Sequence, residues 1–219
     1  MPVDGYNGVI DLSHFQKTPS VKSLADAGIV GVVAKATQGR TLQDGTYLAK
    51  KKALKPNGIK WGSYHYVSGS DVTSQVENYL DHAQPEADEL MAVDYEPSSS
   101  GPNMTYDQLV QYIELIHVHT KRYPVVYGGT LLVDMLKAEP ASVLAASVLL
   151  KCPLWYARYP KPSITSPLGF PPLWSTWTLW QYSDGNAGPE PHNIAGFGVC
   201  DRDTYNGTKA DLIKNWPLT

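Results

Sequence analysis

Two carboxylates stand two positions apart at the end of an apolar run. Residues 90–96 read LMAVDYE, so Asp94 and Glu96 close a segment typical of a buried strand. Side chains two positions apart on a strand point to the same face and lie about 6.5–7 Å apart along it. Two carboxylates in a confined site are not both stable as anions, so the pKa of one should rise until it retains a proton near neutral pH. A retained carboxyl proton is what the general acid of a glycosidase requires.

The strands that would position these acids follow from the apolar pattern. Eight apolar or β-branched runs recur along the chain, and helical patterns lie between most of them. Alternating strands and helices predict a parallel sheet. Continuous apolar strands that are buried on both faces are typical of a (β/α) barrel. The predicted strands cover residues 8–13, 29–37, 59–67, 90–96, 123–129, 153–159, 177–183 and 197–201.

Local signals predict where the helices begin and end. Ser74–Glu77 has the spacing of a capping box, and Thr208–Asp211 forms a second capping pattern. A helix over residues 130–148 is expected to break at Pro140. Residues 160–175 contain five prolines and predict an irregular loop. Two shorter helices are expected at residues 19–27 and 45–56, which Gly28 and Asn57-Gly58 would close.

Length and composition favour one globular domain of the α/β class. The chain has 219 residues, which suffices for an irregular (β/α) barrel over residues 1–219, and we find no linker or internal repeat. A net charge of −3, with no basic run longer than residues 50–52, argues against nucleic-acid binding. No segment approaches the roughly 18 apolar residues that a membrane span needs. The first residues also lack the charged and apolar regions of a signal peptide.

Polar and aromatic residues gather where the predicted strands end, which is where barrel enzymes carry their active sites. A helix cap or a solvated strand end explains any one of the acids equally well. Four acids at one end of a barrel would repel one another, so their grouping indicates a functional site. The candidate acids are Asp11, Asp94, Glu96 and Asp201, and the candidate binding residues are Tyr64, Tyr127, Trp155, Tyr159, Trp180 and Gln181.

Other catalytic chemistries find little support in the sequence. His14 and His65 lack the spacing of metal ligands, and we expect both to be packed, hydrogen-bonded side chains. Cys152 and Cys200 are expected to be buried free thiols at opposite ends of the barrel. Neither a nucleophile-elbow motif nor a phosphate-binding loop is present. Hydrolysis through carboxylates, with no metal and no cofactor, remains the favoured chemistry.

Seven ordered segments resemble the signature blocks of the glycoside hydrolase family 25 lysozymes. The resemblance extends from the first predicted strand to the last, which makes it far more specific than any single block. The segments are GVIDLSHFQ (8–16), KATQG (35–39), GSYHY (62–66), VDYE (93–96), LWYARY (154–159), WQYS (180–183) and CDRDTYNG (200–207).

The resemblance implies a barrel that hydrolyses the β-1,4 bond between N-acetylmuramic acid and N-acetylglucosamine in bacterial peptidoglycan. It implies that Glu96 is the general acid and that Asp94 either attacks the anomeric carbon or stabilises an attacking acetamido group of the substrate. It also implies that Asp11 and Asp201 are further acids of the pocket, beside Tyr64. The aromatic residues expected to stack on sugar faces are Trp155, Tyr159, Trp180 and Tyr182.

Three positions depart from the family pattern. Gln38 stands where an acid is common, Cys200 replaces an apolar residue, and Asp203 stands where Asn is common. Altered sugar subsites or an altered pH preference would be compatible with these changes.

Two other functions are open to a barrel of this kind. A chitinase-type enzyme would need further Asp residues before Asp94, where Leu90 and Ala92 stand. A catalytically inactive glycan-binding barrel would be favoured by loss of Asp94 or Glu96, and both are retained. We therefore expect a monomeric hydrolase whose partner is the glycan strand of peptidoglycan. It would act outside the cell on the bacterial wall, either as a secreted enzyme or as a phage endolysin.

Overall fold

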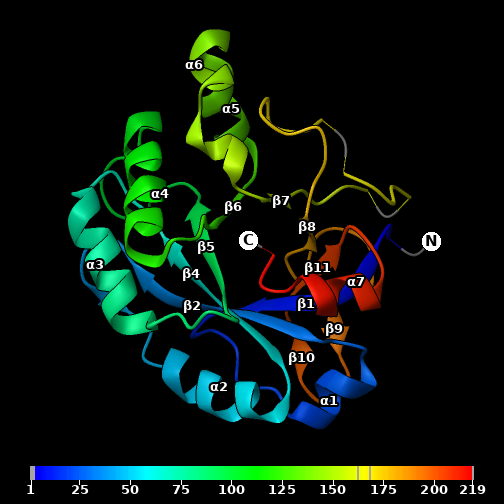
Figure 1. Ribbon diagram of the computed structural model, residues 1–219. Coiled ribbons are helices and arrows are strands. Elements are labelled where there is room, and N and C mark those ends of the chain that lie inside the picture. The colour runs from blue at the N-terminus through cyan, green and yellow to red at the C-terminus, as the bar shows by residue number, and fades with distance from the viewer. Residues whose placement is uncertain (1–2, 162, 168, 219) are drawn as a thin grey trace.

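Eight strands close into a barrel at the centre of the computed structural model, which describes residues 3–161, 163–167 and 169–218 (Figure 1). Neighbouring strands pair around the ring in the order β1-β11-β8-β7-β6-β5-β4-β2, and β2 pairs back to β1. The barrel strands are β1 (Tyr6–Leu12), β2 (Gly31–Gln38), β4 (Lys60–Tyr66), β5 (Leu90–Tyr95), β6 (Val125–Gly128), β7 (Leu154–Ala157), β8 (Leu179–Ser183) and β11 (Asp201–Tyr205).

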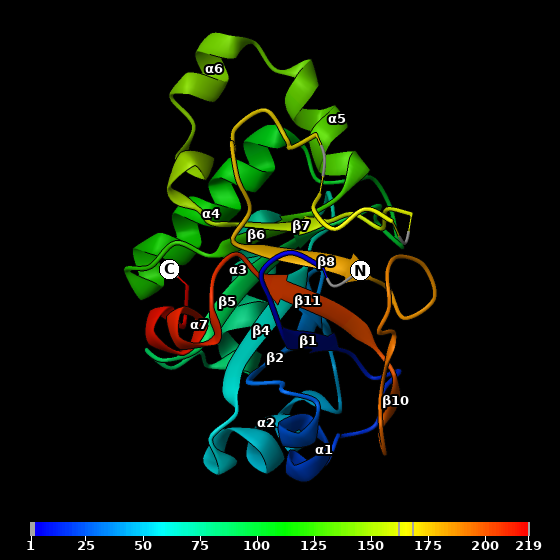
Figure 2. The ribbon, with the colours of Figure 1, turned by 90° about the vertical axis from the view of Figure 1, so that its right-hand side faces the viewer.

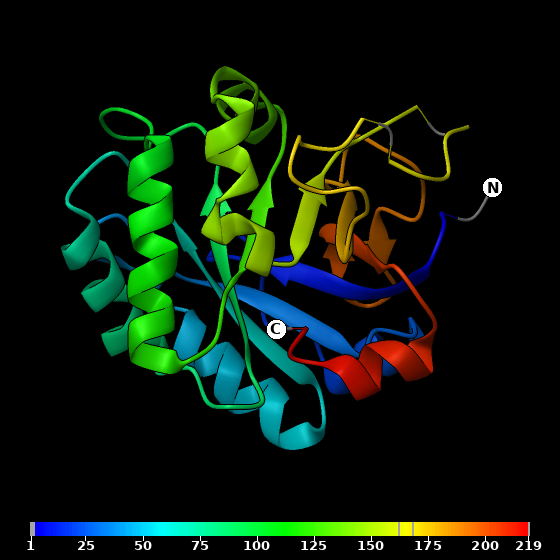
Figure 3. The ribbon, with the colours of Figure 1, turned by 45° about the horizontal axis from the view of Figure 1, so that its top comes forward.

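Helices lie on the outer side of this ring, with α5 and α6 on the opposite side of the molecule from α1 and α2 (Figures 1 and 2). In Figure 3, α3 and α4 stand side by side over the sheet. None of the described helices is long and apolar enough to cross a membrane. The helices are α1 (Val21–Asp26), α2 (Tyr47–Leu54), α3 (Val72–Ala83), α4 (Tyr106–Thr120), α5 (Thr130–Ala138), α6 (Ala141–Ala145) and α7 (Lys209–Asn215). Two 3-10 turns are η1 (Lys55–Asn57) and η2 (Val148–Lys151). Short strands outside the ring are β3 (Leu42–Gln43), β9 (Asn193–Ile194) and β10 (Gly198–Val199).

The last barrel strand differs from its prediction in position and direction. It covers Asp201–Tyr205 instead of residues 197–201, and it runs antiparallel to both β1 and β8. All other neighbouring pairs of the ring are parallel. A parallel connection needs a crossover, usually a helix, and the described segment between β8 and β11 forms only the small β9–β10 hairpin. The sheet is therefore mixed, and Asp201 stands at the start of its strand.

Most helix limits agree with the local signals. Pro140 separates α5 from α6, and Thr208 forms a capping box with Asp211 at the start of α7. The predicted start of α3 at Ser74 is wrong, because Asp71 is the N-cap and its Oδ1 accepts a hydrogen bond of 2.8 Å from the Ser74 N–H. Between β7 and β8, the described residues form neither helix nor strand, as the prolines predicted.

The barrel interior is layered, and the layers position the site. Val9, Val33, Ala92, Val125 and Leu179 fill the lower interior. Two positions further along the same strands, and so on the same face, polar residues form an upper layer above this apolar floor. That layer consists of Asp11, Lys35, Asp94, Tyr127 and Gln181.

Both cysteines are free and buried. Cys152 precedes β7 and Cys200 precedes β11, which runs in the opposite direction. They therefore lie at opposite ends of the barrel, as expected.

Candidate active site

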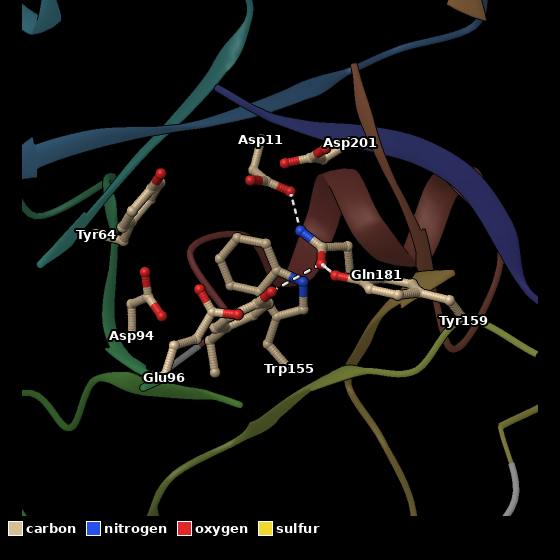
Figure 4. Close-up of a pocket in the computed structure, with 9 residues that line it drawn as sticks. Asp11, Tyr64, Asp94, Glu96, Trp155, Tyr159, Gln181 and Asp201 are labelled. Atoms are coloured by element: carbon tan, nitrogen blue, oxygen red, sulfur yellow. Dashed lines mark hydrogen bonds between the residues drawn. The ribbon is translucent and has the colours of Figure 1, made fainter. Parts of the chain in front are cut away.

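A pocket opens above the polar layer, at the carboxyl ends of the parallel strands (Figure 4). Its volume is about 450 Å³, including the part open to solvent. The structure brings together nine of the ten residues singled out in the sequence. They are Asp11, Tyr64, Asp94, Glu96, Tyr127, Trp155, Tyr159, Gln181 and Asp201.

Trp180 is the exception, and the expectation that it contacts sugar is wrong. Its side chain is fully buried in a separate cluster with Val3, Trp177 and Tyr182, and its indole N–H donates to the Arg158 carbonyl at 2.7 Å. Tyr182 is also fully buried, so its expected stacking on sugar is wrong as well. Successive residues of a strand face opposite sides. Because Gln181 points into the barrel, both of its neighbours must point out.

Asp94 and Glu96 form one acidic side of the pocket (Figure 4). Asp94 is 5% exposed, and its Oδ1 has no hydrogen-bond partner among the described residues. Burial and the neighbouring Glu96 raise the pKa of Asp94 well above its usual value. Burial and the charge of Asp201 raise the pKa of Glu96. The pair therefore retains a proton at a pH where isolated carboxyl groups have lost theirs.

Lys35 is a cation beside this pair, and it was not among the site residues predicted from the sequence. Its ammonium group donates to Gln38 Oε1 at 2.6 Å and lies 4.7 Å from the centre of the Tyr66 ring. Burial lowers the pKa of Lys35, and the charges of Asp94 and Glu96 oppose that change. Lys35 in turn holds down the pKa of both acids. Its place two positions after Val33, on the inward face of its strand, was the signal that could have identified it.

A second acidic group lies across the pocket. Asp11 is paired directly with Asp201 between β1 and β11, and Asp203 is paired with Gln181 between β11 and β8. Burial and the neighbouring acids raise the pKa of Asp11, and burial raises the pKa of Asp201 to about 6. Burial also raises the pKa of Asp203, which is fully buried beneath this pair. Asp203 is thus an acid next to the site, although from the sequence it was predicted only to be a departure from the family pattern.

Neutral donors hold this second group in place. Gln181 Nε2 donates to Asp11 Oδ2 at 2.6 Å, while Gln181 Oε1 accepts the hydroxyl groups of Tyr127, at 2.7 Å, and Tyr159. The indole N–H of Trp155 donates to Asp203 Oδ1 at 2.7 Å. Trp155 is only 1% exposed, so it forms a wall of the pocket and offers no free face for the expected stacking on sugar, whereas Tyr159 is 37% exposed.

The histidines lie outside this pocket. His65 is buried and hydrogen-bonded to Thr37 at 2.7 Å, as expected. His14 is hydrogen-bonded to Asp44 at 3.3 Å, as expected, but its side chain is 48% exposed, so the expectation that it is also packed is wrong. The pocket lining contains carboxylates, phenols, an indole and an amide, and no described histidine or cysteine. Such a set suits acid–base or nucleophilic attack on a glycosidic bond.

Comparisons with known proteins agree with this geometry. The profile of the glycosyl hydrolases family 25 matches residues 10–190. Lysozyme M1 of Streptomyces globisporus is 26% identical over 218 residues, which span 93% of this chain and 69% of that protein. The bacterial lysozyme from Streptomyces coelicolor superposes with a TM-score of 0.77 at 25% identity, covering 96% of each chain. The family GH25 lysozyme from Aspergillus fumigatus gives a TM-score of 0.75 at 26% identity, covering 95% of this chain and 97% of that one.

Proposed function

From the premise that this chain belongs to glycosyl hydrolase family 25, we propose that it is a lysozyme that cleaves the β-1,4 bond between N-acetylmuramic acid and N-acetylglucosamine in peptidoglycan. The single observation that carries the proposal is the buried pair Asp94 and Glu96, which shares one pocket with Asp11 and Asp201. Lysozyme M1 of Streptomyces globisporus supports the choice of substrate.

Glu96 acts as the general acid in this proposal. It is the less buried residue of the pair, and its raised pKa keeps a proton available for the oxygen of the glycosidic bond. Transfer of that proton to the leaving sugar lets the bond break without release of an alkoxide. General acid catalysis of this kind typically contributes 10²–10⁴ in rate.

Asp94 acts on the reacting sugar, whose anomeric carbon loses its bond to the leaving sugar. Once Glu96 carries the shared proton, Asp94 is the anion of the pair and faces the positive charge that develops at the anomeric carbon. It either bonds to that carbon or stabilises a substrate acetamido group that does so. In both routes a water molecule hydrolyses the intermediate in a second step, and Glu96 then acts as the base that accepts a proton from that water.

Asp11, Asp201 and Tyr64 bind the reacting sugar in this scheme, because their polar groups line the same pocket, with Asp11 and Asp201 across from Asp94 and Tyr64 beside it (Figure 4). Tyr127 and Gln181 orient Asp11 through the hydrogen bonds described above. The enzyme acts as a monomer on the bacterial wall, outside the cell that the wall encloses.

A digestion of purified peptidoglycan tests the proposal. Wild-type protein and Glu96→Gln are compared, and new reducing ends are reduced with borohydride and identified by mass spectrometry. Reduced muramic acid from wild type, and its absence with the variant, are expected. Reduced glucosamine would contradict the proposed bond, and binding without products would favour an inactive glycan-binding barrel.

A further inference from the structure

A second and larger hollow adjoins the catalytic pocket. Its volume is about 1250 Å³, and its lining comprises Glu96, residues 129–130, residues 157–161 and Ile164. We call this hollow the side groove. Glu96 and Tyr159 line both hollows, so the two form one continuous depression. A polymer bound in the pocket can therefore extend into the side groove.

The position of Glu96, which lines both hollows, indicates which part of the substrate each hollow holds. A general acid must reach the oxygen that joins the two sugars, so it lies at the boundary between the reacting sugar and the leaving sugar. Asp94 lines the pocket and is absent from the lining of the side groove. The pocket consequently holds the sugar whose anomeric carbon reacts, and the side groove holds the leaving sugar and the units beyond it.

The two hollows carry opposite charge. Four carboxylates line the pocket, and no lysine or arginine is among its described lining residues. The side groove contains Arg158 and Lys161, with Glu96 as its one acid among the residues that the structure describes. Both cations are exposed, and within the described chain neither is ion-paired with a carboxylate. An anionic part of a substrate is therefore repelled by the pocket and attracted by the groove.

Arg158 is anchored by its backbone. Its N–H donates to the Gln181 carbonyl at 3.1 Å, and its own carbonyl accepts the Trp180 indole N–H at 2.7 Å. These bonds fix the origin of the arginine side chain relative to the strand that carries Gln181. The buried Trp180 thus supports the wall of the groove from behind, although it contacts no substrate.

We propose that Arg158 and Lys161 bind carboxylates of the peptide that muramic acid carries on its lactyl group, on the leaving side of the cleaved bond. This inference rests on the proposed function, because it names a further part of the same substrate. The leaving sugar is followed by another muramic acid, whose peptide carries free carboxylates. Arginine suits such a group because its planar donors match a carboxylate bidentately. The enzyme consequently prefers strands whose peptides carry ionised carboxylates over strands whose peptide carboxyl groups are amidated.

The test compares two substrates that differ only in the charge of the peptide carboxyl groups. Sacculi free of teichoic acid provide strands with ionised peptide carboxylates, and treatment with a carbodiimide and ammonia converts these groups to neutral amides, so phosphate polymers are absent from both. We measure kcat/KM on each for wild type, for Arg158→Ala/Lys161→Ala, and for a control with the same change in net charge, Lys52→Ala/Lys214→Ala. The control removes two exposed lysines from α2 and α7.

The groove variant should lower the ratio of kcat/KM on carboxylate-bearing to amidated strands about five- to tenfold, in keeping with two exposed charge pairs. The control should keep the wild-type ratio. An unchanged ratio in the groove variant would overturn the inference, whether or not overall activity falls.

A binding measurement separates this inference from the proposed function. Calorimetric titration of Glu96→Gln with a soluble peptide-bearing tetrasaccharide, before and after amidation of its peptide carboxyl groups, reports the carboxylate contribution without turnover. Tighter binding of the carboxylate form, lost when Arg158→Ala/Lys161→Ala is added, supports the groove assignment. Equal binding of both forms contradicts it. A wild type that cleaves neither substrate would refute the lysozyme proposal, and this titration would still decide the role of the groove.

Discussion

The two sides of the pocket hold their acids in different electrostatic surroundings. On the parallel side, Asp94 and Glu96 face the cation Lys35, which stabilises their ionised forms. On the antiparallel side, Asp11 accepts a hydrogen bond from Gln181 and Asp203 accepts one from Trp155, and both donors are neutral. Neutral donors orient a carboxyl group without supplying a countercharge.

The contrast suggests a division of labour. A pair of acids beside a cation can keep one proton and one negative charge together, which is the state that acid catalysis requires. Burial and the neighbouring acids raise the pKa values of Asp11 and Asp203, and protonated acids donate hydrogen bonds to sugar oxygens. We expect chemistry from the parallel side and substrate positioning from the antiparallel side.

The largest expected effect is that of Glu96→Gln, which removes the proton donor and little volume. We expect kcat on peptidoglycan to fall about 10³-fold, within the range for loss of a general acid. Thermal unfolding should show that the variant folds. Glu114→Gln, an exposed glutamate of α4, is the matched control. A folded and fully active Glu96→Gln protein would refute the role assigned to Glu96.

The division of labour predicts a ranking of the two sides. Asp94→Asn should cost nearly as much in kcat as Glu96→Gln, because it removes the anion of the pair. Asp201→Asn should cost less, about 10-fold to 100-fold, because an amide still donates and accepts hydrogen bonds. Steady-state kinetics on one peptidoglycan preparation decide the order. A larger loss for Asp201→Asn would reverse the roles of the two sides.

Stability should depend on pH through Asp201, whose pKa burial raises to about 6. Between about pH 4 and pH 6 the unfolded chain loses this proton while the folded chain keeps it, so the free energy of unfolding falls as the pH rises. Relative to wild type, Asp201→Asn should gain up to about 3 kcal/mol between about pH 3.5 and pH 7. Urea unfolding at both pH values measures the gain. A constant difference between the two proteins would contradict the raised pKa.

Removal of the cation should make the parallel side resemble the antiparallel side. Lys35→Met deletes the charge that lowers the pKa of Asp94 and Glu96, so both pKa values should rise. The general acid would then stay protonated to higher pH, and the pH profile of kcat/KM should move in the alkaline direction. Lys35→Arg, which retains the charge, should keep the profile near that of wild type. A shift toward acid pH would contradict the role of Lys35.

The smallest effect is expected from a substitution of Asp203, which stands where Asn is common in the family. Its charge contributes to the raised pKa of Asp11, so Asp203→Asn should lower the pKa of Asp11. The new amide oxygen can still accept the Trp155 indole N–H. A titration of carboxyl carbons by NMR, with Asp11 assigned by its own Asn variant, measures the change. An unaltered Asp11 titration would show that Asp203 does not act on it.

Local patterns predicted much of this architecture. The apolar runs located seven of the eight barrel strands, and the spacing of Asp94 and Glu96 predicted that both would face one pocket. Side-chain alternation along a strand also explains which way Lys35 and Trp180 face. Since Val33 and Leu179 lie inside the barrel, position 35 had to face inward and position 180 outward.

Asp201 was placed correctly for a reason that proved wrong. It was expected at the carboxyl end of a parallel strand, and it stands at the start of an antiparallel one. The two differences cancel, because reversal brings the start of β11 to the end of the barrel where the other strands finish. The same reversal pairs Asp203 with Gln181.

The sequence by itself determined seven of the eight barrel strands, the helix cap at Thr208 and which residues share a face, because these depend on near neighbours and on the period of each element. Only the tertiary structure decided the direction of β11, the position of Lys35 beside Asp94 and Glu96, and the continuity of the pocket with the side groove. Each of these depends on pairing or packing between segments far apart in the chain. Burial then set the pKa values, since the loss of water around a carboxyl group exists only once the barrel has closed.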